Sequence, residues 1–228
     1  MEGSGQQEGR VRVSLVIPAY NEAERLPSVV ETAAGVELID EIVVVDDGSR
    51  DGTARAAQRL AIAKLRLFVH PQNLGKGMAM LTGFKQSRGR VVAFVDADLI
   101  GLRPDHLVAL VEPVLLGECD ATLGVFQQGR APTDLAQKVA PGISGQRAVR
   151  RELLEGFADW DQRYGIEVAL NHYLEKAGAK VRRVELRGLS HQMKEEKRGL
   201  LPGFVERMAM YRDILGWKLN RLVRRNRR

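Results

Sequence analysis

The chain has 228 residues, of which 44% are hydrophobic and 28% charged, with a formal net charge of +6. This composition is typical of a folded globular protein and excludes a collagen-like or largely disordered chain. Only 5% of the residues are aromatic, which leaves few side chains that could stack on nucleic-acid bases. We therefore expect no nucleic-acid partner.

Strands and helices are predicted to alternate along the first hundred residues. Apolar runs predict strands at 11–20, 40–49, 65–70 and 90–98, with Pro18 ending the first one. Helices are predicted between them at 21–35, 49–63 and 75–87, with Asn21 capping the first and Ser49 or Asp51 the second. This alternation predicts the α/β class, with a mostly parallel, Rossmann-like sheet flanked by helices.

The second half has a less regular pattern. It predicts a helix at 103–117, a strand at 119–127, a glycine-containing turn into a helix across 142–156, and a helix at 165–178. A strand at 179–188 and a long helix at 201–225 follow. We interpret residues 1–10 as a disordered leader and 11–228 as one domain. Its parts are a nucleotide-binding half (11–100), an acceptor half (101–213) and a basic amphipathic tail (214–228).

Acidic residues follow several of the predicted strands. Asp47 lies at the end of the second predicted strand, and Asp96 and Asp98 at the end of the fourth. In open sheets of this type, ligands bind beyond the carboxyl ends of the strands. Asp96 and Asp98 are two residues apart, so on an extended chain both point to the same side. Such a pair can hold Mg²⁺ or Mn²⁺ and leave positions open for phosphate oxygens, although the same triplet also occurs as ordinary loop acids.

The first hundred residues resemble family 2-type glycosyltransferases of the GT-A fold. The resemblance rests on three segments in matching order: "VSLVIPAYNEAERL", "EIVVVDDGSRDGT" and "NLGKGMAMLTGFKQSRGRVVAFVDAD". It implies a GT-A fold and a nucleoside-diphosphate sugar as donor. It also implies donor-binding residues: Pro18, Ala19, Tyr20 and Glu22 around base and ribose, Asp47 near the base, Gly75 and Lys76 near the nucleotide, and Asp96, Ala97 and Asp98 at the ribose and metal-bound diphosphate.

The second half is similar to the glucosyl-3-phosphoglycerate synthases. The matching segments are "SGQRAVRRELL", "YGIEVALNHYLEKAG" and "LRGLSHQMKEEKRG". The similarity implies that His191 joins Asp98 as a metal ligand and that Glu167 is the glutamate of the family's active-site segment. Arg163 stands where that family has glycine, and this chain is shorter, so the acceptor stays open.

Candidate acceptor-side residues follow from their chemistry. Glu167 can accept a hydrogen bond from the donor sugar or act as a base toward the acceptor hydroxyl, or it can simply complement a helix dipole. Asp159 and Asp161 are rival bases. Gly145 and Arg147 are predicted to bind the acceptor, and Arg147 suits an anionic one because a guanidinium pairs with phosphate in a bidentate way.

These observations predict a metal-dependent hexosyltransferase with Asp98 and Glu167 as catalytic residues. It would move a sugar from a nucleoside-diphosphate donor, UDP favoured over GDP, to a hydroxyl or phosphate acceptor such as 3-phosphoglycerate. One alternative is a polyprenyl-phosphate sugar transferase at the membrane surface. Another is a catalytically inactive nucleotide-sugar-binding protein. Inversion or retention at the anomeric carbon stays open.

The sequence also predicts a cytoplasmic location. Cys119 is the single cysteine, so no internal disulfide can form and a reducing compartment is favoured. The start of the chain, "MEGSGQQEGR", lacks the apolar core of a signal peptide. The basic tail could contact a membrane peripherally, and a homodimer is one option for the oligomeric state.

Overall fold

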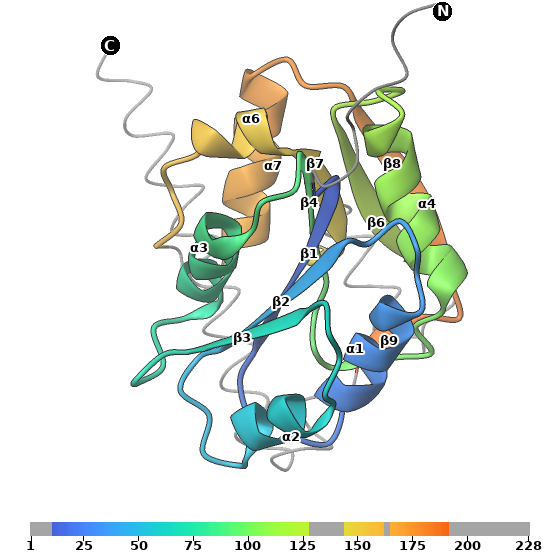
Figure 1. Cartoon of the computed structure of the whole chain (residues 1–228). Helices are drawn as coiled ribbons and strands as arrows, with labels where there is room; N and C mark the ends of the chain where they lie inside the picture. The colour runs from blue at the N-terminus through green and yellow to red at the C-terminus, as the bar shows by residue number, and fades with distance from the viewer. Residues whose placement is uncertain (1–10, 128–143, 162–164, 192–228) are drawn as a thin grey trace, which may run out of the picture.

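The computed structural model describes residues 11–127, 144–161 and 165–191 (Figure 1). Its main feature is a seven-stranded sheet in the order β3-β2-β1-β4-β7-β6-β8. The strands are β1 (Val13–Ala19), β2 (Glu41–Asp46), β3 (Leu65–Val69), β4 (Val91–Phe94), β6 (Ala121–Gln127), β7 (Arg147–Arg150) and β8 (Val181–Arg187). The helices are α1 (Leu26–Ala34), α2 (Thr53–Arg59), α3 (Lys76–Gln86), α4 (Pro104–Leu115), α6 (Arg151–Glu155) and α7 (Ile166–Lys176).

Helices cover both faces of the sheet, as the alternation predicts (Figure 1). Apolar side chains of α1, α2 and α4 pack with one face of the strands in one core cluster. Side chains of α3, α6 and α7 pack with the other face in a second cluster. Strands β1, β2, β3 and β4 are parallel to their neighbours in this group, so the predicted parallel α/β half is confirmed.

Strand β1 continues through Pro18, where the sequence predicts its end. The carbonyl of Val16 accepts a hydrogen bond from the N–H of Val95, so the backbone groups of Val16 point toward β4. Residues two apart in a strand direct their backbone groups to the same side, so the nitrogen of Pro18 also points toward β4. Strand β4 has already ended at Phe94 at this level. The missing N–H of Pro18 therefore costs no hydrogen bond in the ladder.

The first helix begins later than predicted, and Asn21 does not cap it. Helix α1 begins at Leu26, and Asn21 has a positive φ of 56°. The Asn21 side chain accepts a hydrogen bond from the N–H of Arg50 instead. At the second helix the N-cap is Gly52, so neither Ser49 nor Asp51 holds the predicted cap position. Asp51, one residue earlier, accepts a hydrogen bond from the N–H of Thr53.

The largest difference from the prediction lies at residues 142–156. Residues 147–150 form strand β7, and only residues 151–155 are helical. Strand β7 pairs antiparallel with β4, with Phe94 opposite Arg147. The residues just before β7 therefore reach the sheet edge where β1, β2 and β4 end.

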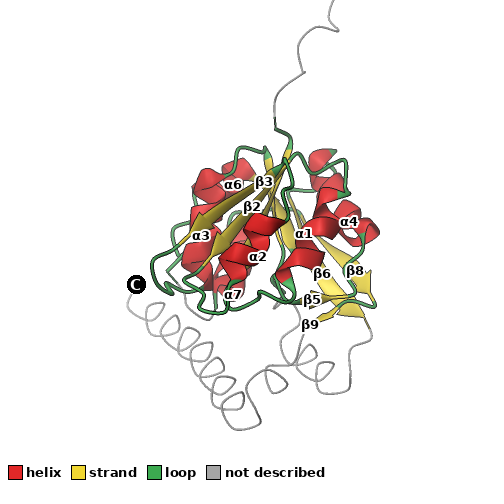
Figure 2. Cartoon of the chain, turned by 60° about the horizontal axis from the view of Figure 1, so that its bottom comes forward, coloured by secondary structure: helices red, strands yellow, loops and turns green. Residues whose placement is uncertain are grey.

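A small second sheet lies beside the main one. It consists of β5 (Leu99–Ile100) and β9 (Ser190–His191), which the sequence does not predict (Figure 2). They pair antiparallel, with Leu99 opposite His191. The predicted leader, the terminal helix and the basic tail lie outside the described residues.

Candidate active site

The candidate site lies where the strand order of the main sheet reverses. Strand β1 has β2 on one side and β4 on the other, and a crevice opens beyond the carboxyl ends of such strands. Tyr20 follows β1 and is 39% exposed, so its ring is accessible to a ligand. Asp96 and Asp98 follow β4 and are half-buried.

A lysine joins two carboxylates at this edge of the sheet. The Lys76 ammonium, at the start of α3, lies 2.6 Å from Asp96 Oδ1 and 2.6 Å from Glu167 Oε1. Glu167 is in the first turn of α7. The structure thus brings together Lys76, Asp96 and Glu167, three of the residues that the sequence places in the site.

Local charges shift the pKa values of this group. Burial alone would raise the pKa of Glu167, but the charge and hydrogen bond of Lys76 and the charge of Arg147 hold it below its usual value. Burial opposes the charge of Lys76, yet Asp96 and Glu167 raise the pKa of that ammonium. Lys76 and Glu167 are therefore both ionised at neutral pH.

Gln146 belongs to this network and is absent from the sequence-based site. Its side-chain amide donates to Asp96 Oδ2 at 2.9 Å, and its carbonyl accepts from the Ser144 hydroxyl at 2.8 Å. Gln146 is fully buried, so it holds the Asp96 carboxylate in a fixed orientation. Only the antiparallel pairing of β7 with β4 brings it there, and the sequence carries no local signal of that pairing.

Arg147 takes a position that differs from its predicted acceptor-binding role. The side chain is 1% exposed and donates to Asn171 Oδ1 and the Ser144 carbonyl. Burial lowers the pKa of this guanidinium, while Glu167 and Asp96 raise it. In this arrangement Arg147 supports Glu167 from inside the protein and presents no guanidinium to a ligand in the crevice.

Gly145 lies against Asp96, and this contact needs a residue without a side chain. A Cβ atom at Gly145 would come within 2.5 Å of Asp96 Oδ2. A Gly145→Ala variant is therefore expected to displace Asp96 and weaken UDP binding by about tenfold or more, equivalent to about 1.4 kcal/mol. Isothermal titration calorimetry measures this affinity.

The matched control for that variant is Gly35→Ala. There a new Cβ would meet its nearest atom at 3.6 Å, an ordinary contact. Equal UDP affinity in both variants would contradict a role for Asp96 in nucleotide binding.

Asp47 anchors the loop that leads to Lys76. Its carboxylate accepts hydrogen bonds from the N–H groups of Leu74 and Gly75 and lies 2.7 Å from His70 Nδ1. Asp47 is 3% exposed, so it acts on the site chiefly by positioning this loop. Gly75 has a φ of 98°, a conformation that favours glycine, and it directs the chain into α3.

A second set of hydrogen bonds fixes the segment after β1. The N–H of Asn21 donates to Ser49 Oγ, and the N–H of Glu22 donates to Thr53 Oγ1. Pro18 and Ala19 lie at the end of β1 beside Val45 and Asp46 of β2. The structure therefore holds the predicted base-binding and ribose-binding segment next to the end of β2.

The pairing of β5 with β9 brings the backbone of His191 close to that of Asp98. Leu99, the residue after Asp98, is opposite His191 in the β5–β9 pair. Ala97, between the two acids, is 3% exposed. Among the described side chains, no group of three or more histidines, cysteines or acids is arranged to hold a metal ion.

The two predicted rival bases lie in one exposed segment. Asp159 and Asp161 are exposed residues of the segment between α6 and α7. Arg163 and the basic loop with Lys194, Lys197 and Arg198 lie outside the described residues.

The fold, with its candidate site where the strand order reverses, is of the GT-A type. The profile of the family described as "Glycosyl transferase family 2" matches residues 14–212. The chain therefore belongs to glycosyl transferase family 2, and the family and fold inferred from the sequence are confirmed.

Individual relatives add detail. The glucosyl-3-phosphoglycerate synthase of Mycobacterium tuberculosis (strain CDC 1551 / Oshkosh) is 30% identical over 69% of this chain and 59% of the relative. The undecaprenyl-phosphate 4-deoxy-4-formamido-L-arabinose transferase of Pseudomonas fluorescens (strain SBW25) is 41% identical over 46% of this chain and 33% of the relative. The chain thus spans about one third to three fifths of the length of these curated relatives.

Solved structures show the same likeness over more of the chain. The Mycobacterium tuberculosis glucosyl-3-phosphoglycerate synthase with Mg²⁺ and UDP matches with a TM-score of 0.74 and 28% identity, covering 93% of this chain and 79% of that one. The same synthase with Mn²⁺, UDP-glucose and phosphoglyceric acid also gives a TM-score of 0.74, covering 93% and 80%. In the part of this chain that is described, no helix has the length and apolar character needed to cross a bilayer.

Proposed function

We propose that this chain transfers a sugar from a nucleoside diphosphate, with UDP favoured, to a hydroxyl or phosphate acceptor, with Mg²⁺ or Mn²⁺ as cofactor. The proposal rests on the ion pairs of Lys76 with Asp96 and Glu167, which lie where the strand order of the main sheet reverses. Mg²⁺ or Mn²⁺ in the solved relatives supports the choice of cofactor. The cytoplasmic location expected from the single cysteine is part of the proposal.

Each donor-side residue has a role that fits its position. Tyr20 offers an exposed ring to the base, and Asp96 offers a carboxylate oxygen to the ribose hydroxyls. Lys76 is close enough to the crevice to turn from its two carboxylates toward diphosphate oxygens. Pro18, Ala19 and Glu22 line the base and ribose segment, while Asp47 and Gly75 hold the loop before Lys76.

The metal ligands in this proposal are Asp98 and His191. A hard cation accepts carboxylate oxygen and imidazole nitrogen as ligands, and the β5–β9 pairing brings these two parts of the chain together. When bound, the cation would stabilise the charge of the departing diphosphate. Ala97, between the two acids, lies in the turn that connects β4 to β5.

Glu167 is better suited to binding the donor sugar than to removing a proton. Its lowered pKa makes the carboxylate a weak base, and Lys76 shares one of its oxygens. An ionised carboxylate in this position can accept hydrogen bonds from sugar hydroxyls. If Glu167 binds the donor sugar, it is not the base that would favour an inverting mechanism. The assignment is therefore compatible with retention, which the resemblance of the second half to the glucosyl-3-phosphoglycerate synthases suggests.

The donor proposal is tested by thermal melting with UDP and with GDP, each with and without Mn²⁺. At 100 times its dissociation constant a ligand adds about 2.7 kcal/mol of stability, which raises the melting temperature of a domain of this size by about 5–10 °C. We expect this rise with UDP and Mn²⁺ together. No rise with either nucleotide would contradict the donor site.

A polyprenyl-phosphate acceptor is the second candidate. The 41% identity to an undecaprenyl-phosphate sugar transferase supports it, but the match covers only 46% of this chain. The match to the phosphoglycerate synthase extends over 69%, so a small phosphorylated acid is favoured. Labelled UDP-glucose offered with 3-phosphoglycerate or with a lipid extract separates the two, because the product enters either the aqueous or the organic phase.

A further inference from the structure

Strand β8 forms one edge of the main sheet within the described chain. It pairs with β6 on one side and is the last strand in the sheet order. Most of its side chains are exposed, and Val181 is 43% exposed. An exposed edge strand offers backbone N–H and C=O groups to a further strand.

The backbone contacts show which residues present those groups. The carbonyl of Lys180 accepts hydrogen bonds from the N–H groups of Asp120 and Ala121 on the β6 side. Because backbone groups of successive strand residues point to opposite sides, those of Val181, Arg183 and Glu185 point away from β6.

The contacts of Arg187, at the carboxyl end of β8, agree with this alternation. The Arg187 carbonyl accepts a hydrogen bond from Arg103 Nη1 at 3.2 Å, and His106 Nε2 lies 3.1 Å from it. These contacts come from the start of α4, so they occupy the edge at Arg187 and leave Arg183 and Glu185 available to a further strand.

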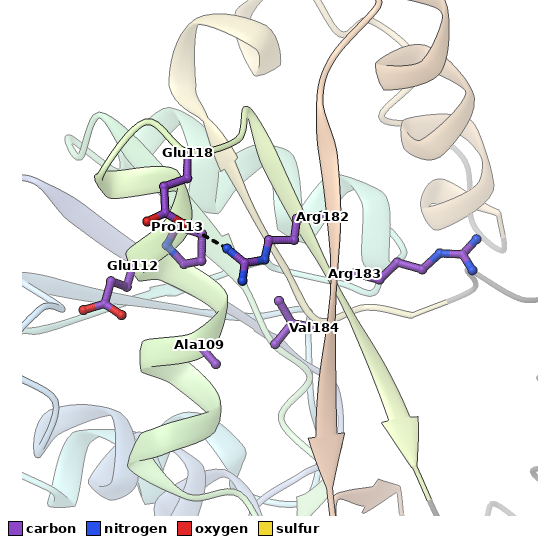
Figure 3. A pocket seen from close by; sticks show the side chains of 7 residues that line it. All are labelled: Ala109, Glu112, Pro113, Glu118, Arg182, Arg183 and Val184. Carbon is purple, nitrogen blue, oxygen red and sulfur yellow. Dashed lines mark hydrogen bonds and ion pairs between the residues drawn. The ribbon is translucent and has the colours of Figure 1, made fainter.

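The side chains of β8 alternate between two faces. Arg182 and Val184 face α4, where Arg182 pairs with Glu118 at 2.8 Å (Figure 3). A surface depression lies between α4 and β8 on this face. Arg183 extends to the other side of the sheet (Figure 3), and Glu185 shares that face.

We propose that two copies of this chain pair through β8, antiparallel and centred on Val184. In this register Arg183 of each copy lies opposite Glu185 of the other. Both residues present outward backbone groups, so each such pair can exchange two backbone hydrogen bonds. Opposite charges at directly opposed positions stabilise antiparallel pairs.

The charge pattern favours this register over its neighbours. A shift by two residues in one direction places Arg183 opposite Arg183, and a shift in the other direction places Glu185 opposite Glu185. Like charges at these positions are destabilising. The alternative intrachain partner of Glu185 is Arg187 on the same face, at 3.1 Å, and it can remain in contact while Arg183 of the second copy approaches.

The pattern is self-complementary, which identifies the partner as a second copy of this chain. An arginine and a glutamate flank Val184 symmetrically, and a two-fold axis at Val184 pairs each with the other. A contact through two edge strands is small, so we expect a dissociation constant in the micromolar range, typical of weak interfaces. The pairing does not depend on the proposed transfer activity.

The test is sedimentation equilibrium of the full chain and of two charge-reversal variants. We expect a concentration-dependent dimer for the wild type. Arg183→Glu alone and Glu185→Arg alone should each raise the dissociation constant about tenfold or more, because each places like charges opposite one another. An equimolar mixture of the two variants should restore dimers, because every pair is again of opposite charge.

Two variants serve as controls for net charge. Arg55→Glu on α2 and Glu37→Arg before β2 change the net charge equally at exposed positions away from β8, and both should dimerise like the wild type. A wild type that stays monomeric up to about 100 μM would overturn the proposal. So would a dimer that neither single variant weakens, or a mixture that stays monomeric.

Discussion

Replacing Asp98 with alanine is expected to lower kcat for sugar transfer about 10²–10³-fold, the range seen when one group that stabilises transition-state charge is removed. The proposed reason is loss of the cation that would otherwise stabilise the departing diphosphate. The melting temperature without ligand should change little, because Asp98 is half-buried at a loop after β4. A coupled assay for UDP release measures the effect.

Two comparisons separate a metal role from a general loss of structure. Asp98→Asn keeps the size of the side chain and should be almost as inactive as the alanine variant. Glu37→Ala removes an exposed acid before β2 and should leave kcat unchanged. If Asp98→Ala still showed an Mn²⁺-dependent melting shift with UDP, Asp98 would not be a metal ligand.

Replacing Lys76 with methionine is expected to have the largest effect on stability. Asp96 and Glu167 would then face each other without the cation that separates them. Loss of one partner of a buried ion pair costs about 3–5 kcal/mol, and Lys76 is 31% exposed, so we expect about 2 kcal/mol at pH 7.5. UDP affinity should also fall, because the cation proposed for the diphosphate is gone.

The pH dependence of that loss has a defined sign. In the wild type Glu167 has a lowered pKa, so its contribution is present at neutral pH and is lost as the pH falls below about 4, near the unfolded value. Without Lys76, burial and the mutual repulsion of the carboxylates raise their pKa values, so the variant should lose stability as the pH rises from 5 to 8.

Urea unfolding at several pH values tests this expectation. Lys76→Arg, which keeps the charge, should retain most of the stability. The double variant Lys76→Met/Glu167→Gln should recover stability without recovering UDP affinity. A Lys76→Met protein as stable as the wild type at pH 8 would show that the ion pairs contribute nothing.

The regular half of the fold could be predicted from the sequence because its signals are local. Runs such as Glu41–Asp46 are apolar along their whole length, as buried parallel strands are. Strand β7 was misassigned as a helix because its four residues, Arg147–Arg150, hold two arginines and run directly into a helix. Its strand character comes from pairing with β4 and β6, which no local pattern reveals.

The same distinction applies to the site. Lys76, Asp96 and Glu167 belong to recognisable segments, and the structure brings them into contact. In its buried position Arg147 donates to Asn171, which is 24 residues away on helix α7. The sequence predicts that Arg147 binds an anionic acceptor because a guanidinium pairs well with phosphate, and no local pattern indicates that this side chain is buried.

Strand β7 joins the sheet antiparallel to β4, so the proposed nucleotide site depends on residues from both halves of the chain. Asp96 is held by Gln146, 50 residues later, and Lys76 by Glu167, 91 residues later. A nascent chain that has released only its first hundred residues would carry Asp96 and Lys76 without these supports. Nucleotide binding should therefore appear late in synthesis, and UDP should protect both halves together against proteolysis, because the proposed site is complete only after both halves have folded onto one sheet.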